Sequence, residues 1–101
     1  MPGYDDVMRA AVESVLLVAA RSPIDTTLIA VTFDAGRGPG PHESHTLTIS
    51  VRETSIAVSD HAIPHDWLPS STGFIDSRFA KLIGARLADL TAKAQAAGVY
   101  L

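Results

Sequence analysis

The chain has 101 residues, of which 47% are hydrophobic and 19% charged, a composition that excludes a disordered protein and fits one small domain. It has no cysteine, so disulfides, thiolate zinc sites and a cysteine nucleophile are excluded. Its net charge of −3 gives no overall attraction to nucleic acid or anionic lipid. The longest apolar run, residues 15–20, is too short to span a bilayer, and Asp5 and Asp6 stand where a signal peptide would be basic. We therefore expect a cytoplasmic protein without membrane contact, and its high alanine content is typical of bacterial chains.

Residues 4–21 are expected to form the first helix, which ends because the residue before Pro23 is disfavoured in the α conformation. Leu16 borders the apolar face of this helix and Leu17 lies beyond it, so the apolar surface is wider than one sheet normally covers. This width indicates that something else packs against the helix. The apolar face itself consists of Tyr4, Val7, Met8, Ala11, Val12, Val15, Val18 and Ala19.

Residues 25–34, 45–51 and 54–60 alternate apolar and polar side chains, as half-buried strands do. If Arg52 and Glu53 form the turn of the second hairpin, residue 49 lies opposite residue 56. A turn two residues longer keeps the same faces together and only shifts the pairing. The dipeptide lacks the glycine or asparagine that tight turns favour, so the longer turn stays open.

The last helix is expected to begin between residues 72 and 76 and to end at Gly98, a residue suited to a left-handed C-terminal cap. Its apolar stripe comprises Ile75, Phe79, Ile83, Leu87, Leu90, Ala94 and Ala97. Its far side carries a ridge of small residues, Ala85, Ala88, Ala92 and Ala96. Helix propensity alone explains such a ridge, and close approach by the first helix or by a second subunit is the alternative.

This order of elements predicts an α+β fold, α-β-β-β-α, in which a three-stranded antiparallel meander carries two helices packed on one face. We expect residues 1–101 to form a single domain. The opposite face of the sheet would carry no charge except Arg52 at its end, which suits solvent or an approaching protein layer. Its predicted side chains are Leu28, Ala30, Thr32, Thr46, Thr48, Ser50, Ser55, Ala57 and Ser59.

All four histidines of the chain are expected at one end of the second hairpin. With nearby acids they form a set of candidate ligands, and imidazole and carboxylate groups suit zinc, nickel or copper. The set is His42, Glu43, His45, Asp60, His61, His65 and Asp66, with Trp67 beside it. Strand alternation, however, directs His45 toward the helices and His61 away from them. This favours ordinary solvated or hydrogen-bonded histidines, and we expect no cofactor or metal.

His45 and Asp60 are expected to be neighbours, directly opposite with the short turn and diagonal with the longer one. A nearby carboxylate favours the charged imidazole, so we hypothesise a raised His45 pKa and a hairpin sensitive to pH.

No catalytic motif is evident in the sequence. There is no G-x-S-x-G elbow, and the glycine-rich loop at residues 36–41 lacks the Lys-Ser/Thr of a phosphate-binding loop. Trp67 is expected to close the crossover from sheet to helix as a packing residue, with ligand stacking as the alternative.

The helix–strand–strand–strand–helix order, with Gly40, Pro41 and His42 before the second strand, is similar to double-stranded RNA-binding domains. The resemblance implies RNA contacts by that loop and by basic residues that open the last helix, here Arg78 and Lys81. The helix opening lacks a lysine cluster and the chain is acidic, whereas RNA binding requires neutralisation of phosphates. Nucleic acid is therefore not the expected partner.

The sequence thus favours a small interaction module without enzymatic activity that forms a homodimer, its protein partner unknown. The alternatives are a metal- or ligand-binding protein that uses the histidine end, and a nucleic-acid-binding domain.

Overall fold

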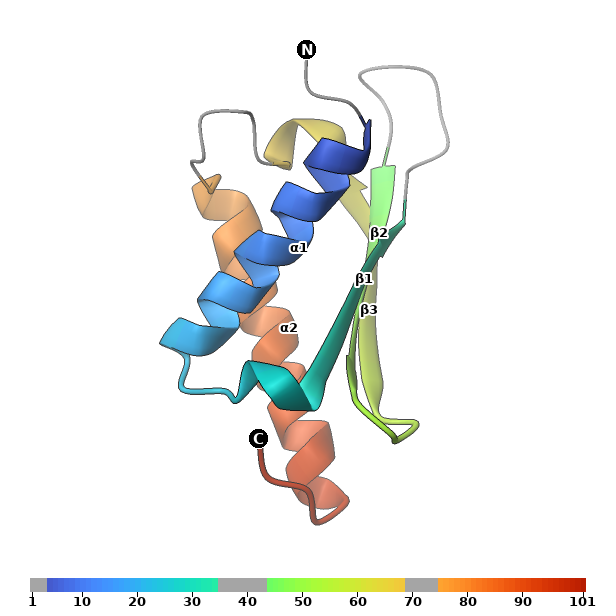
Figure 1. The fold of residues 1–101 in the computed structure, drawn as a ribbon, viewed down its shortest axis with the longest axis vertical. Coiled ribbons are helices and arrows are strands. Elements are labelled where there is room, and N and C mark those ends of the chain that lie inside the picture. Colours follow the sequence, from blue (N-terminus) through green and yellow to red (C-terminus); the bar gives the residue numbers. More distant parts are fainter. Residues whose placement is uncertain (1–3, 35–43, 69–74) are drawn as a thin grey trace.

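The computed structural model describes residues 4–34, 44–68 and 75–101, and it confirms the predicted α+β order (Figure 1). The antiparallel sheet has the strand order β1-β2-β3, and both helices lie on the same side of it (Figure 1). The other side of the sheet has no described layer against it. The elements are helix α1 (Tyr4–Arg21), 3₁₀ helix η1 (Thr26–Leu28), strands β1 (Ile29–Asp34), β2 (Ser44–Val51) and β3 (Ala57–Pro64), 3₁₀ helix η3 (His65–Trp67) and helix α2 (Ser77–Ala96).

Helix α1 packs the described part of its predicted face on the sheet and on α2, and the side chains of Tyr4 and Val7 lie outside the described residues. Ala11, Val15 and Ala19 are fully buried, whereas Leu17 is 44% exposed. The hydroxyl of Ser14, also buried, donates to the carbonyl of Ala10 at 2.8 Å, so a polar group is accommodated beside the core.

Strand β1 is shorter than predicted, because residues 25–28 form a capped turn instead of extended chain. An Asp25 carboxylate oxygen accepts hydrogen bonds from the backbone N–H of Thr27 at 3.0 Å and from its hydroxyl at 2.6 Å. These bonds hold the pKa of Asp25 below its ordinary value. The hydrogen bonds of the Asp25 side chain thus outweigh the strand preference of the β-branched residues in this segment. A pattern of alternating residues does not reveal such a cap.

The second hairpin has the longer of the two predicted turns, and the short-turn pairing is wrong. Ile49 lies opposite Val58, and the N–H of Val51 donates to the carbonyl of Ile56 at 2.9 Å. Glu53 lies in this turn with a φ of 63°. The third strand accordingly spans residues 57–64 rather than 54–60, and the apolar rows still coincide.

Strand β3 contains a β-bulge that the sequence did not indicate. Leu47 pairs with Asp60 and His45 pairs with Ile63, so β3 has one residue more than β2 over this interval. An Asp60 carboxylate oxygen accepts from the N–H of Ala62 at 3.2 Å within the bulge. The extra residue inverts the alternation and turns Ile63 into the core, where it is fully buried.

Helix α2 begins and ends at identifiable caps. Asp76 is its N-cap, and Gly98 follows it with a φ of 80°. The N–H of Val99 donates to the carbonyl of Ala94 at 2.8 Å and that of Gly98 to Gln95 at 3.0 Å, which is the Schellman arrangement. Most of the predicted stripe is buried, namely Phe79, Ile83, Leu87, Leu90 and Ala94. Neither α1 nor α2 is long and apolar enough in its described part to cross a bilayer.

Candidate functional site

The histidines predicted at one end of the second hairpin do not lie together, because one is in the core and another is on the surface. His45 is 1% exposed, lies under the helices and stacks on Phe33 with ring centroids 5.6 Å apart. His61 is exposed on the bulge. His42 and Glu43 lie outside the described residues, as does the side chain of His65, whose backbone is in η3. The structure therefore separates His45 from His61, as strand alternation predicted.

The acids of the candidate ligand set also lie apart from one another. Asp60 lies opposite Leu47, which is the diagonal position relative to His45 that the longer turn predicted. Asp66 is exposed on η3 and approaches Arg78. Among the side chains that the structure describes, no group of three or more metal-ligating residues lies together. The raised His45 pKa stays a prediction.

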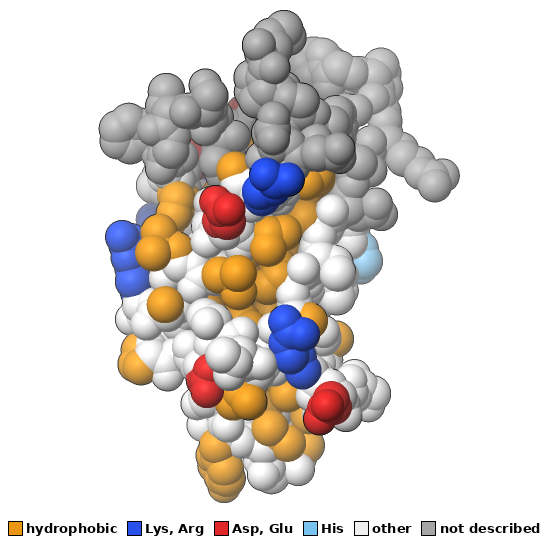
Figure 2. Space-filling model, viewed as in Figure 1, with side chains coloured by type: hydrophobic (Ala, Val, Ile, Leu, Met, Phe, Trp, Pro, Cys, Tyr) orange, Lys and Arg blue, Asp and Glu red, His pale blue; other side chains and the backbone are white. Residues whose placement is uncertain are grey.

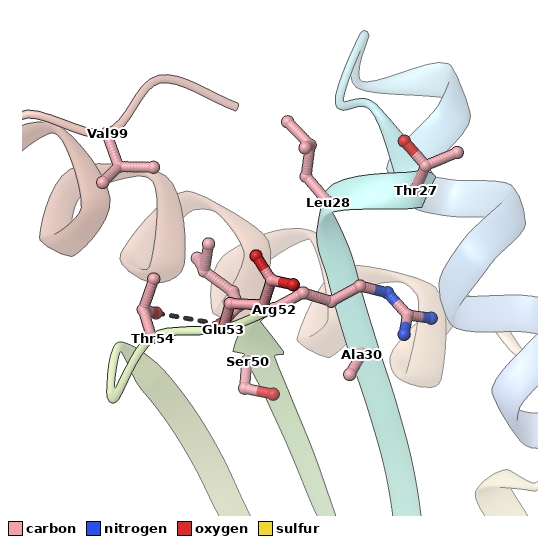
Figure 3. Close-up of a pocket in the computed structure, with 9 residues that line it drawn as sticks. Thr27, Leu28, Ala30, Ser50, Arg52, Glu53, Thr54 and Val99 are labelled. Atoms are coloured by element: carbon pink, nitrogen blue, oxygen red, sulfur yellow. Dashed lines mark hydrogen bonds between the residues drawn. The ribbon is translucent and has the colours of Figure 1, made fainter.

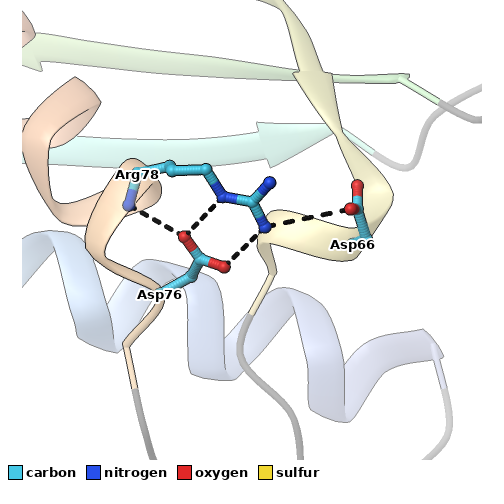
Figure 4. Close-up of polar contacts among 3 residues, drawn as sticks. All are labelled: Asp66, Asp76 and Arg78. Carbon is cyan, nitrogen blue, oxygen red and sulfur yellow. Dashed lines mark hydrogen bonds and ion pairs between the residues drawn. The ribbon is translucent and has the colours of Figure 1, made fainter.

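A polar cluster that sequence reasoning missed joins η3 to the start of α2 (Figure 4). The Arg78 guanidinium donates to both carboxylate oxygens of Asp76, at 3.0 Å and 2.8 Å, and lies 3.9 Å from Asp66. The backbone N–H of Arg78 also donates to Asp76 at 2.8 Å. The hydrogen bonds from the Arg78 side chain are the main reason that the pKa of Asp76 is lowered to about 2. The sequence signal that could have revealed this cluster is Asp-x-Arg at a helix start.

Trp67 completes this cluster as a packing residue. It is partly buried against the core, beside the buried Leu68, and the Arg78 guanidinium carbon lies 5.3 Å from the centre of its ring. This geometry is a cation–π contact. The RNA-binding resemblance assigned Arg78 to phosphate, but two carboxylates and an aromatic face already engage its charge.

The largest described hollow lies at the opposite end of the sheet, beside the second hairpin turn (Figure 3). It has a volume of about 620 Å³ and is open to solvent. Arg52 crosses it, and its Nε donates to the carbonyl of Ile29 at 3.0 Å. The walls are Thr27, Leu28, Ala30, Ser50, Val51, Arg52, Glu53, Thr54 and Val99. With its one cation already bonded to the backbone, this hollow offers little to hold a charged ligand.

The described open face of the sheet carries the small and hydroxyl side chains that the sequence predicted, with Arg52 at its end, whereas Ser55, also predicted here, lies in the turn before β3. Thr32 and Ser59 are exposed, and Leu28 is 38% exposed. The hydroxyls of Thr48 and Ser59 lie 3.1 Å apart across β2 and β3 and form a hydrogen bond. Such a flat hydroxyl surface carries no catalytic group, but a second protein layer can approach it closely.

An apolar surface follows the edge of the sandwich where α1 borders β1. Figure 2 shows hydrophobic side chains gathered between these two elements. Met8, Val12 and Leu16 recur every fourth residue on one flank of α1 and are only partly buried, as is Val31 of β1. Helix α1 lies against β1 (Figure 1), and from the handedness of the helix we infer that this flank is the one on the β1 side. We call these residues, with Phe33, the α1–β1 strip.

The alanine ridge of α2 is exposed along its length, at Ala85, Ala88, Ala92 and Ala96. Helix α1 therefore does not cover it, and propensity alone or a second subunit remain as its explanations. Three charged residues of α2 make contacts near its β3 side: Arg86 is 3.3 Å from Asp89, and the Lys93 ammonium donates to the carbonyl of Ala57 at 3.1 Å. Asp89 and Lys93, which the i,i+4 spacing of a helix would favour as a pair, thus contact other groups.

The fold and these surfaces define a two-layer α+β domain with one open sheet face and an apolar edge. No protein-family model matches the chain, and comparison with curated proteins and with solved structures also finds no match. Its function is therefore inferred from the geometry of the described residues.

Proposed function

We propose that this chain is a protein–protein interaction module that acts as a homodimer and has no enzymatic activity. The α1–β1 strip carries the proposal. Met8, Leu16 and Val31 pack against the core, and with Val12 they are only partly buried, so each of the four leaves apolar surface in water. Burial of apolar surface is the main source of affinity between subunits, and twofold homodimers are the commonest oligomers.

Catalysis has no comparable support among the described residues. His45 is buried beneath the helices. The carboxylates of Asp66 and Asp76 both form ion pairs with Arg78. The hollow beside the second hairpin turn has Ser50, Thr54 and Glu53 in its walls, but no hydrogen bond recorded in the described structure links the Glu53 carboxylate to either hydroxyl. Metal binding by the histidine end and RNA binding by Arg78 are disfavoured by the same contacts.

Static light scattering at micromolar concentration tests the proposal, and we expect twice the mass of one chain. Thermal unfolding gives a second measurement, because dimerisation makes the Tm rise with protein concentration. A chain that is monomeric by scattering, with a Tm independent of concentration, would overturn the proposal.

Two neighbouring leucines of α1 provide a matched pair of variants. Leu16→Glu places a charge in the α1–β1 strip and is expected to shift the protein to monomer. Leu17→Glu is the control, since Leu17 is 44% exposed and lies one helical step outside the strip. Circular dichroism verifies that both variants keep their helices, and equal effects of the two on mass would contradict the assignment of the strip.

A further inference from the structure

We propose that the homodimer forms by antiparallel pairing of two β1 strands about a twofold axis midway between the two copies of Val31. This pairing joins the two sheets into one. This inference rests on the proposed homodimer and adds its interface, its register and the arrangement of its layers.

The outer edge of β1 presents backbone groups suited to another strand. The N–H of Arg52 donates to the carbonyl of Leu28 at 2.8 Å, so the backbone groups of Leu28 point toward β2. In an antiparallel ladder the two groups of one residue point the same way, and direction alternates along the strand. The N–H and C=O groups of Ile29, Val31 and Phe33 therefore point away from β2, and β2 is the only strand paired with β1 in the described sheet.

The two edges of the sheet differ in how they resist such pairing. The β3 edge contains the bulge and Pro64, and Lys93 occupies the carbonyl of Ala57. Bulges, prolines and lysines are the usual means by which proteins block an edge strand. Strand β1, with the sequence IAVTFD, has none of these within Ile29–Asp34. Of the two edges, β1 is therefore the less blocked, since its contact of this kind is that of Arg52 with the Ile29 carbonyl at the start of the strand.

Symmetry restricts the register. A twofold axis that relates two antiparallel edge strands is perpendicular to the sheet. Because outward residues can bond only to outward residues, this axis passes midway between the two copies of one residue, which are paired with each other. An axis at Val31 pairs Ile29 with Phe33 of the other copy, and all outward groups of both strands find partners. An axis at Ala30 or Thr32 leaves one outward residue of each strand unpaired. The Ile29 carbonyl, which already accepts from Arg52, has a second lone pair for this bond.

The same axis accounts for the apolar flank of α1, which is an independent observation. A perpendicular axis puts both helical layers on the same side of the joined sheet and brings α1 alongside its copy, antiparallel to it. Met8, Val12 and Leu16, only partly buried in one chain, would then pack against the equivalent residues. The exposed Arg9 and Glu13 on this helix have opposite charges, so the paired helices do not present like charge only.

Val31→Pro tests the edge directly. Proline removes an outward N–H and keeps the ladder between β1 and β2, because edge strands tolerate proline where the N–H faces solvent. We expect a folded monomer, with the dimer dissociation constant raised by about 100-fold. A Val31→Pro protein that is folded and dimerises as tightly as the wild type would overturn the proposal.

Cysteine variants test the register and do not depend on the proline variant folding. The chain has no natural cysteine, so each variant has a single thiol per chain. With the axis at Val31, the two copies of residue 31 have Cα atoms about 5.5 Å apart, within disulfide range, whereas those of residue 32 are beyond about 7 Å. Under oxidised glutathione, Val31→Cys is expected to form a covalent dimer and Thr32→Cys is not.

The outcomes separate this inference from the proposed function. A dimeric wild type whose Val31→Cys variant does not cross-link, or whose Thr32→Cys variant cross-links instead, overturns the register and leaves the homodimer standing. A monomeric wild type overturns both.

Discussion

At the scale of single residues, the ends of the elements depend on side chains and glycines at particular backbone angles. Gly98 has a φ of 80°, a conformation that costs an L-residue about 1 kcal/mol or more because its Cβ approaches the backbone. Gly84, in the interior of α2, has no such requirement, and a Cβ built there meets nothing within 4 Å. The two glycines of one helix therefore have opposite consequences for stability.

We expect Gly98→Ala to lower the free energy of unfolding by about 1 kcal/mol, because it strains the Schellman cap. Gly84→Ala is expected to raise it by about 0.5–1 kcal/mol, since alanine has the higher helix propensity. Urea titration monitored by circular dichroism measures both. Changes of the same sign would show that Gly98 does not form the left-handed cap described above.

The Asp76 carboxylate predicts a dependence of stability on pH. Its pKa is lowered from 3.8 to about 2 in the folded protein, so it contributes stability that is present above pH 3.8 and is lost as pH falls through 2. Asp76→Ala is expected to lower the Tm at neutral pH, with the difference from wild type disappearing near pH 2. Asp76→Asn keeps a capping oxygen but no charge, so its Tm at neutral pH is expected to lie between those of Asp76→Ala and the wild type. A difference that persists unchanged near pH 2 would rule out the carboxylate as its cause.

At the scale of elements, the bulge in β3 decides which side chains of the hairpin are inside. Regular alternation from Val58 would place Ala62 in the core and Ile63 outside. The extra residue reverses this, so that Ile63 fills the space under the helices next to His45. The bulge also ends the regular edge of β3, which bears on the choice of β1 as the open edge.

Ile63→Ala is therefore expected to destabilise the protein by about 2–4 kcal/mol through loss of buried surface and the cavity left behind. His61→Ala, on the exposed side of the same bulge, should change stability by less than about 0.5 kcal/mol. Chemical denaturation of both variants gives the comparison. Comparable losses at the two positions would mean that the bulge does not direct Ile63 inward.

At the scale of the whole molecule, a three-stranded sheet with helices on one side leaves two further surfaces, an open face and an open edge. The interface proposed at β1 uses the outer edge of β1 and the flank of α1. Joining the two sheets doubles the area of the open sheet face and leaves that face uncovered. The joined face, with Thr48 and Ser59 near its centre in each half, would remain available to another protein. The dimer and its contact with a partner thus need not compete for the same surface.

The amino-acid sequence alone determined the order of the elements, the faces of both helices and which residues of β1 and β2 lie toward the helices, since periodicities of 3.6 and 2 are local properties. It did not do so for β3 beyond the bulge. It also separated His45 from His61 by alternation, and it identified Gly98 as a helix end. The start of β1 was predicted wrongly because the Asp25 cap competes locally with the strand, and the pattern of β-branched residues does not contain that competition.

Only the tertiary structure decided the turn length, the bulge, and the contact of Arg78 with Asp76 and Trp67. Two registers that preserve the same faces bury nearly the same hydrophobic pattern, so their difference is set by how β2, β3 and the helices pack together. In the observed register Ile63 and His45 are paired and both are buried under the helices. Contacts between residues distant along the chain, such as that of Arg78 with Trp67, result from this packing. They cannot be read from the local pattern of apolar and polar residues.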